Sequence, residues 1–148
     1  MERESLEVDV LVVGAGPSSL SFAINLARLA ESNSEELSIL ILDKASEIGH
    51  HQLSGAVMDA KAILELFPDA ENKGFPVESK VTKDSFLWLG KSGQIQMKGL
   101  LCPPQFKNEG NWIVSANKMV KWLTEQAESL GVEVYPGFAG ASPLFLLA

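Results

Sequence analysis

The strongest constraint on this chain is a short apolar run that ends at a glycine turn and continues into a helical pattern. Residues 8–13 are apolar except for Asp9, as expected of a strand buried on both faces. The run breaks at the sequence Gly14-Ala15-Gly16, and from residue 17 the apolar residues recur at helical spacing as far as Ala30. The order of strand, glycine turn and helix predicts the first half of a dinucleotide-binding βαβ unit.

The residue types of this turn suit an anion. Gly14 lets the chain turn sharply, and Gly16 lacks the Cβ that would keep a pyrophosphate away. Pro17 suits the first turn of a helix, whose free N–H groups and positive dipole end attract the pyrophosphate. Ser19 replaces the third glycine of the fingerprint, and its small side chain predicts a slightly wider crossing of helix and strand. We expect residues 14 and 16–19, including Ser18, to bind the cofactor.

A second apolar run, residues 37–42, ends at Asp43. A carboxylate at the carboxyl tip of the second strand is placed to accept hydrogen bonds from both ribose hydroxyls of an adenosine. Asp43 lies further from the turn than the ~20 residues of the nicotinamide fingerprint, because a polar turn at residues 31–36 separates the helix from the strand. The alternative is a solvated aspartate at a strand end.

Composition excludes several classes of protein. The chain has 148 residues, 46% of them hydrophobic and 21% charged, which is typical of a soluble globular domain with its own core. A net charge of −7 without a basic cluster argues against nucleic-acid binding. The single cysteine, Cys102, allows no intramolecular disulfide and favours an intracellular location. No apolar run is long enough to span a membrane, and residues 1–5 resemble neither a signal peptide nor a transit peptide.

The segment that follows the second strand leaves the edge of the sheet where ligands of open α/β folds bind. It extends from Lys44 to Ala56 and includes His50 and His51. Adjacent histidines in a loop rarely bind one metal ion, and no acidic or cysteine partner lies at ligand spacing. We therefore expect hydrogen bonding within the loop and no metal site.

The middle of the chain predicts a long insertion. Asp59 is expected to cap a short helix that ends at Phe67. Residues 77–81 are ambiguous. Residues 84–89 and 94–97 predict a β-hairpin around a glycine-bounded turn. The hairpin carries many large apolar side chains, which either cover a sheet or form an interaction surface.

The last part of the chain returns to the α/β pattern. A second long helix is expected to open at Ser115, with Gly131 directly after it. Residues 132–135 predict a third parallel strand, and right-handed connections give the strand order 3-2-1. Residues 139–148 are apolar without periodicity. The predicted fold class is therefore α/β, with a Rossmann-like βαβ unit, a long insertion and an incomplete domain.

Five segments of the sequence carry a more specific signal: V-D-V-L-V-V-G-A-G-P (8–17), I-G-H-H-Q-L-S-G-A (48–56), L-F-P-D (66–69), N-E-G-N-W-I-V-S (108–115) and W-L-T-E-Q-A-E-S-L-G-V-E-V-Y-P-G-F-A (122–139). Together they resemble the electron-transfer flavoprotein–ubiquinone oxidoreductase family, from the N-terminus to about Gly140. A generic Rossmann domain does not need the last two segments. Ser19 and His50 depart from the family, which typically has glycine and alanine there.

The resemblance implies that FAD is the cofactor. In that family the glycine turn and the acidic residue after the second strand bind the ADP half of FAD, and the I-G-x-H-x-L-S-G-A loop approaches the flavin. Besides the glycine turn and Asp43, the resemblance thus implies five further FAD-binding residues: Lys44, His51, Leu53, Ser54 and Gly55. No catalytic residue is expected, because electron transfer between flavin, cluster and quinone requires no general acid or base from this region.

The resemblance also implies partners. The family takes electrons from reduced electron-transfer flavoprotein and passes them to ubiquinone in the respiratory chain, at a membrane surface. This implies a peripheral location, on the cytoplasmic face of the inner membrane if the source is bacterial. A 4Fe-4S cluster needs four thiolates, so it is expected only in a C-terminal part of the parent protein. Residues 1–148 are then the N-terminal part of an FAD-binding domain, inactive alone.

Membrane contact is expected from residues 86–104. Lys83, Lys91 and Lys98 add positive charge to an otherwise acidic chain, which favours contact with anionic headgroups. Trp88 combines an apolar body with a polar N–H. The alternative is that these side chains cover the sheet.

Three other functions stay open. A related prenyl (geranylgeranyl) reductase would share the first FAD unit, and an inactive truncated product would explain the aperiodic residues 139–148. An NAD-dependent dehydrogenase is the weakest of these alternatives. About ninety residues separate the expected second and third parallel strands, far more than the usual short connection.

Overall fold

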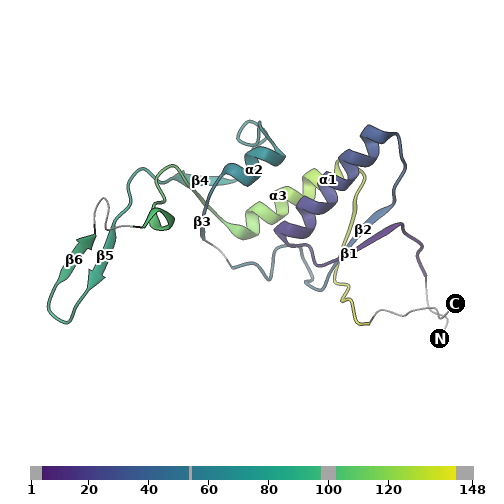
Figure 1. Ribbon diagram of the computed structural model, residues 1–148. Helices are drawn as coiled ribbons and strands as arrows, with labels where there is room; N and C mark the ends of the chain where they lie inside the picture. Colours follow the sequence, from purple (N-terminus) through teal and green to yellow (C-terminus); the bar gives the residue numbers. More distant parts are fainter. Residues whose placement is uncertain (1–4, 54, 98–102, 143–148) are drawn as a thin grey trace. The chain divides into compact units, whose positions relative to one another are not determined.

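A computed structural model describes residues 5–53, 55–97 and 103–142 (Figure 1). Two units make up the chain. Residues up to 54 and those from 116 onward form one, here called the parallel-sheet unit; residues 55–115 form the other, here called the inserted unit. The inserted unit corresponds to the insertion predicted between the second and third parallel strands.

Three parallel strands form the sheet of the parallel-sheet unit. They are β1 (Val10–Val13), β2 (Ile39–Asp43) and β8 (Glu133–Pro136). The central strand β2 pairs with both others, and Ile41 lies opposite Val12 on one side and Val134 on the other. The order β1-β2-β8 confirms the predicted order 3-2-1.

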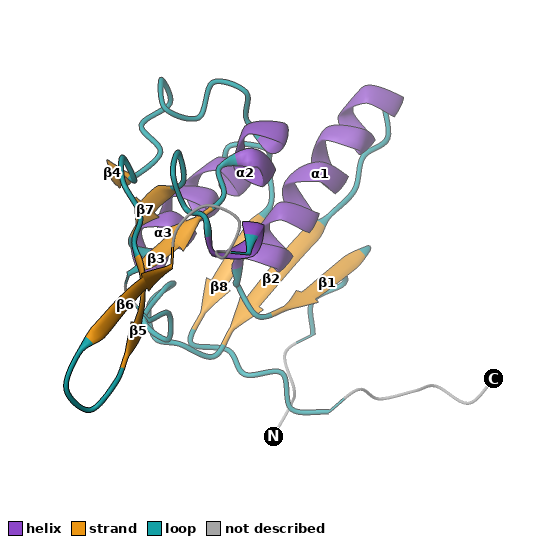
Figure 2. Cartoon of the chain, turned by 60° about the vertical axis from the view of Figure 1, so that its left-hand side comes forward, coloured by secondary structure: helices purple, strands orange, loops and turns teal. Residues whose placement is uncertain are grey.

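Two helices pack side by side on one face of this sheet: α1 (Pro17–Asn33) and α3 (Ala116–Glu128) (Figure 2). The core lies between the helices and β2, and its most buried side chains are Leu20, Ile24, Ile41, Val120 and Leu123. Burying each such side chain stabilises the fold by about 1.5–3 kcal/mol. The helical spacing of apolar residues identified both helices, and α3 begins one residue after the predicted Ser115.

The opposite face of the sheet is largely open, so the prediction that the first strand is buried on both faces is wrong. Leu11 is 53% exposed and Val13 is 62% exposed. Because β1 is an edge strand and α1 and α3 lie on one side, alternate side chains of β1 point away from the core. A hollow of about 680 Å³ on the open side is lined by these residues: Ser5, Leu6, Val8, Leu11, Leu40, Leu42, Tyr135 and Phe138.

The inserted unit contains an antiparallel sheet with the order β3-β7-β4. These strands are β3 (Ala56–Met58), β4 (Val77–Lys80) and β7 (Trp112–Val114). β4 corresponds to the ambiguous segment 77–81. β3 and β7 were not predicted, because a three-residue strand is too short to show an alternating pattern.

A short helix and the predicted hairpin complete the inserted unit. The helix α2 (Lys61–Leu66) begins later than expected, with Ala60 as its N-cap, although the Asp59 carboxylate still accepts the Lys61 N–H at 2.9 Å. The strands β5 (Phe86–Leu89) and β6 (Gln94–Met97) pair antiparallel and confirm the hairpin. A 3-10 turn, η2 (Pro104–Phe106), follows. Within the described ranges, no helix is both long and apolar enough to cross a bilayer.

Candidate functional site

The glycine turn connects β1 to α1 at the carboxyl edge of the parallel sheet. Gly14 has a φ of +96°, in the region that favours glycine, and its N–H donates to the Leu42 carbonyl at 2.6 Å. Gly16 is the N-cap of α1 and Pro17 its first residue, as predicted. A Cβ built on Gly14 or Gly16 would meet no atom within 4 Å. Open space therefore lies beside both glycines, where a bound phosphate requires it.

Asp43 ends β2 and ties the glycine turn to the following loop. Its Oδ2 accepts the Ala15 N–H at 2.7 Å, and its Oδ1 accepts the Ala45 N–H at 2.8 Å. The half-buried carboxylate is thus engaged on both oxygens, unlike a solvated aspartate at a strand end. Each oxygen keeps a further lone pair that could accept a hydroxyl donor.

A pocket of about 300 Å³ lies at this edge of the sheet. Five of the predicted cofactor-binding residues line it: Gly14, Gly16, Asp43, Lys44 and His51. The structure therefore brings together the backbone of the glycine turn and residues of the loop after β2. A larger hollow of about 730 Å³ lies at the amino edge. Its lining includes Asp9, Glu31, Glu35 and Glu36, which would repel a phosphate, so the smaller pocket is the candidate site.

The other predicted residues lie outside the lining of this pocket. Pro17, Ser18 and Ser19 form the first turn of α1, whose leading N–H groups have no intrahelical acceptor. Leu53 is 91% exposed. Ser54 falls outside the described residues, and Gly55 begins the inserted unit.

Sequence reasoning missed part of the pocket wall that follows β8. Phe138, Ala139 and Gly140 line the pocket, as does Gln52. The Phe138 N–H donates to the Asp43 carbonyl at 2.9 Å, and a Cβ on Gly140 would lie 2.8 Å from Cγ1 of Val13. The predicted sheet topology could have indicated these residues. The carboxyl ends of parallel strands meet at one edge, so the segment after the third strand lies at the site.

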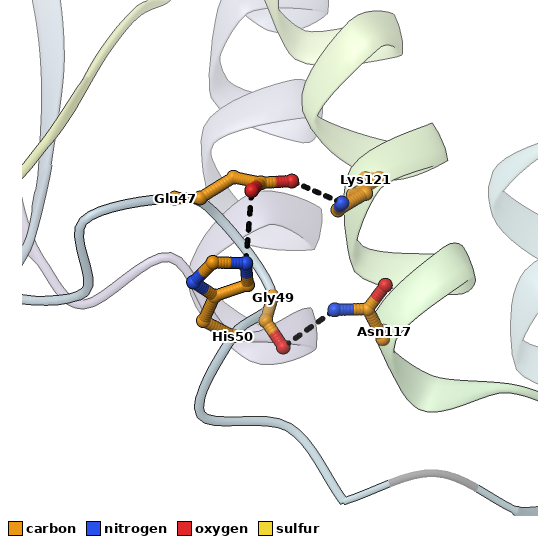
Figure 3. A network of polar contacts seen from close by, with 5 residues as sticks. All are labelled: Glu47, Gly49, His50, Asn117 and Lys121. Atoms are coloured by element: carbon orange, nitrogen blue, oxygen red, sulfur yellow. Dashed lines mark hydrogen bonds and ion pairs between the residues drawn. The ribbon is translucent and has the colours of Figure 1, made fainter.

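The loop after β2 makes polar contacts with α3 (Figure 3). The Glu47 carboxylate pairs with Lys121 and lies 2.8 Å from Nε2 of His50. The hydrogen bond from Lys121 and the nearby positive charges lower the pKa of Glu47 from its ordinary value. His50 thus bonds within the loop, as predicted. Across the part of the chain that the structure describes, no cluster of His, Cys, Asp and Glu could hold a metal ion.

Comparison with curated proteins identifies the relatives of this chain. The protein named electron transfer flavoprotein-ubiquinone oxidoreductase, mitochondrial, from Dictyostelium discoideum is 47% identical over 143 residues, and that from Homo sapiens is 46% identical over 145 residues. The Pseudomonas aeruginosa protein of that name is 44% identical over 146 residues. The chain is a homologue of the electron transfer flavoprotein–ubiquinone oxidoreductases. This confirms the resemblance, although no protein-family model matches.

These alignments cover nearly the whole chain but a minority of each relative. They span 97%, 98% and 97% of the chain, and 23%, 23% and 26% of the D. discoideum, H. sapiens and P. aeruginosa proteins. The chain therefore spans about a quarter of the length of the curated relatives that it matches.

Solved structures share the fold of the chain. A geranylgeranyl bacteriochlorophyll reductase-like protein from Thermoplasma acidophilum matches with a TM-score of 0.58 and 22% identity, over 88% of this chain and 30% of that one. The FAD-dependent halogenase CndH also has a TM-score of 0.58, with 20% identity over 94% of this chain and 30% of its own. At such identities the likeness shows the fold alone, a Rossmann-like fold found in FAD-dependent oxidoreductases.

Proposed function

We propose that the carboxyl-edge pocket binds the ADP half of FAD. The observation that carries this proposal is the convergence of Gly14, Gly16, Asp43, Lys44 and His51 on one pocket from two separate segments of sequence. The homologues' name and the FAD-dependent relatives in the fold comparison support FAD as the cofactor.

Each group has a role that follows from its position. The pyrophosphate lies beside the two glycines and receives N–H donors from the first turn of α1, with Ser18 and Ser19 beside it. Lys44 adds positive charge and His51 a further polar group. Asp43 accepts hydrogen bonds from the ribose hydroxyls while its bonds to Ala15 and Ala45 fix the shape of the turn. The flavin itself supplies the redox chemistry when it is bound.

The homologues support a wider proposal for the protein to which this chain corresponds. It carries electrons between electron-transfer flavoprotein and ubiquinone, the two partners that the relatives' name states for those proteins, and the direction that we propose is from the reduced flavoprotein to the quinone. The iron–sulfur cluster of the family needs four thiolates, and this sequence has one cysteine, so we place any cluster beyond the matched quarter. A prenyl reductase is the second candidate, favoured by the fold match to the T. acidophilum protein. The much higher identity to the oxidoreductases outweighs it.

Peripheral membrane contact is proposed through the β5–β6 hairpin. Trp88, Leu89 and Ile95 are 66%, 71% and 68% exposed, and this exposure favours an interaction surface over cover for a sheet. Lys83 and Lys91 flank the apolar side chains with positive charge, as attraction to anionic headgroups requires.

Cofactor extraction tests the proposed function. The 148-residue chain is purified, its bound small molecules are released with acid, and nucleotides are identified by chromatography and mass spectrometry. If the purified chain carries no nucleotide, it is first incubated with equimolar FAD and NAD and desalted. We expect FAD. Recovery of a nicotinamide nucleotide alone, or of neither nucleotide after the incubation, would contradict the proposal.

A further inference from the structure

The wall of the proposed FAD pocket includes two residues from a loop that is fixed to a helix. His51 and Gln52 line the pocket, and they follow a short turn at residues 47–50. In this turn the His50 N–H donates to the Glu47 carbonyl at 3.2 Å. The Gln52 N–H then donates to the Gly49 carbonyl at 2.9 Å. The Gly49 carbonyl therefore determines where Gln52 lies in the wall.

Asn117, in the first turn of α3, bonds to the same carbonyl. Its Nδ2 donates to the Gly49 oxygen at 2.8 Å, in a partly buried contact between residues 68 positions apart (Figure 3). The two lone pairs of that oxygen are thus occupied by Asn117 and by Gln52. Gly49 has a φ of +88°, and a Cβ there would lie 2.8 Å from the Asn117 Nδ2. The side chain of Asn117 lies directly against the backbone of the loop, which only glycine permits.

A second contact lies one helical turn further along α3. Lys121 follows Asn117 by four positions, so both side chains share one face of the helix. Lys121 pairs with Glu47, which His50 also contacts. Both partners of this ion pair are about half exposed, and exposed pairs contribute little. The partly buried amide of Asn117 is therefore the principal link, and Lys121 an auxiliary one.

We propose that Asn117 is a positioning residue for the FAD pocket. It holds Gly49, and through Gly49 it holds His51 and Gln52, in the pocket wall before the cofactor arrives. A wall that is ordered in advance avoids the entropy cost of ordering it on binding. This inference rests on the proposed function, because it concerns the affinity of the same pocket for FAD.

The experiment compares three variants of the full 148-residue chain. Asn117→Ala removes the donor, and Asn117→Asp removes it while keeping the shape of the side chain. Asn25→Ala is the matched control, because the Asn25 Nδ2 also donates to a helix-associated carbonyl, that of Ser21, away from the loop. FAD affinity is measured by titration. Amide hydrogen exchange of Gln52 in the FAD-free chain is measured by NMR, and circular dichroism verifies folding.

We expect both Asn117 variants to bind FAD about three- to tenfold more weakly, the effect of losing one hydrogen bond. The Gln52 amide should exchange faster in both variants, whereas Asn25→Ala should change neither quantity. A purely global loss of stability would instead speed exchange throughout the unit. If the wild type binds FAD and folded Asn117→Asp binds it equally well, the positioning role is refuted while the proposed function stands. If the wild type binds no FAD, both fail.

Discussion

At the scale of single residues, Asp43 has a role both in the fold and in the candidate site. Its two carboxylate oxygens accept N–H groups from Ala15 in the glycine turn and from Ala45 in the next loop. The same oxygens are the proposed acceptors for ribose. One side chain thus shapes the turn and is also the proposed ligand contact, so its substitution should affect both stability and binding.

We predict that Asp43→Ala weakens FAD binding by about 1–3 kcal/mol, the usual size for hydrogen bonds to a charged group. It should also lower the free energy of unfolding, because two partly buried N–H groups lose their acceptor. Calorimetric titration and urea unfolding measure the two effects. Asp43→Asn, which keeps one acceptor oxygen, is the control and should be intermediate. An unchanged affinity would mean that Asp43 has only the structural role.

Glu47 gives a prediction about pH. Its hydrogen bond from Lys121, together with electrostatic attraction to His50 and Lys121, lowers its pKa from the ordinary value. Because the folded-state pKa lies below the unfolded value, the pair stabilises the loop at pH values above the ordinary glutamate range. That contribution is lost as the pH falls through the folded-state pKa. Carboxyl NMR titration should give Glu47 a higher pKa in Lys121→Ala than in the wild type. An identical titration in both would show that the pair does not form.

At the scale of elements, strongly periodic segments were predictable and short ones were not. α1, α3 and the three parallel strands follow from apolar spacing and from the glycine turn. β3 and β7 have three residues each, too few for a pattern. The open face of β1 was not predicted. A continuous apolar run shows that a strand has apolar side chains on both faces, but it does not show that other elements pack against both faces. The pocket residues after β8 were missed because only the topology brings them to the site.

The open face of the sheet predicts a contrast between two strand residues. Leu11→Ser on the exposed side of β1 should change the free energy of unfolding by less than about 1 kcal/mol. Ile41→Ala in the fully buried centre of β2 should cost about 2–5 kcal/mol. Urea unfolding of the 148-residue chain measures both. Equal costs would show that something covers Leu11 in solution.

The hairpin predicts a position-specific response to lipid. Trp88 is exposed, whereas Trp112 and Trp122 are only 3% and 6% exposed. The two buried tryptophans therefore need no substitution, and the core stays intact. Vesicles of anionic lipid with brominated acyl chains should quench part of the tryptophan fluorescence. Trp88→Phe should abolish this quenching. Neutral vesicles should quench the wild-type chain less than anionic vesicles do. Quenching that persists in Trp88→Phe, or none in the folded wild type, would contradict docking through β5–β6.

At the scale of the whole molecule, the chain combines a parallel-sheet unit that carries the site with an inserted unit that carries the hairpin. The homologues have about three quarters of their length outside the match. The candidate site thus corresponds to one part of these longer homologues.

We predict that the purified 148-residue chain does not reduce ubiquinone with reduced electron-transfer flavoprotein, even when it is loaded with FAD. The sequence has one cysteine, so it cannot supply the four thiolates of the proposed cluster. Quinone reduction is followed spectrophotometrically, with the full-length P. aeruginosa homologue as the positive control. Turnover by the chain alone at a comparable rate would refute the proposal that ubiquinone reduction needs parts of the homologues outside the match.

Binding of the ADP half of FAD in the carboxyl-edge pocket is the proposal on which the others depend. The most direct measurement is an NMR titration of the isotope-labelled chain with FAD, following each backbone amide. We expect the largest shifts to cluster at residues 14–19 and 43–52. ADP should reproduce them, because the flavin is not needed for these contacts. No shift in this pocket, or shifts confined to the acidic hollow at the amino edge of the sheet, would contradict FAD binding at the carboxyl edge.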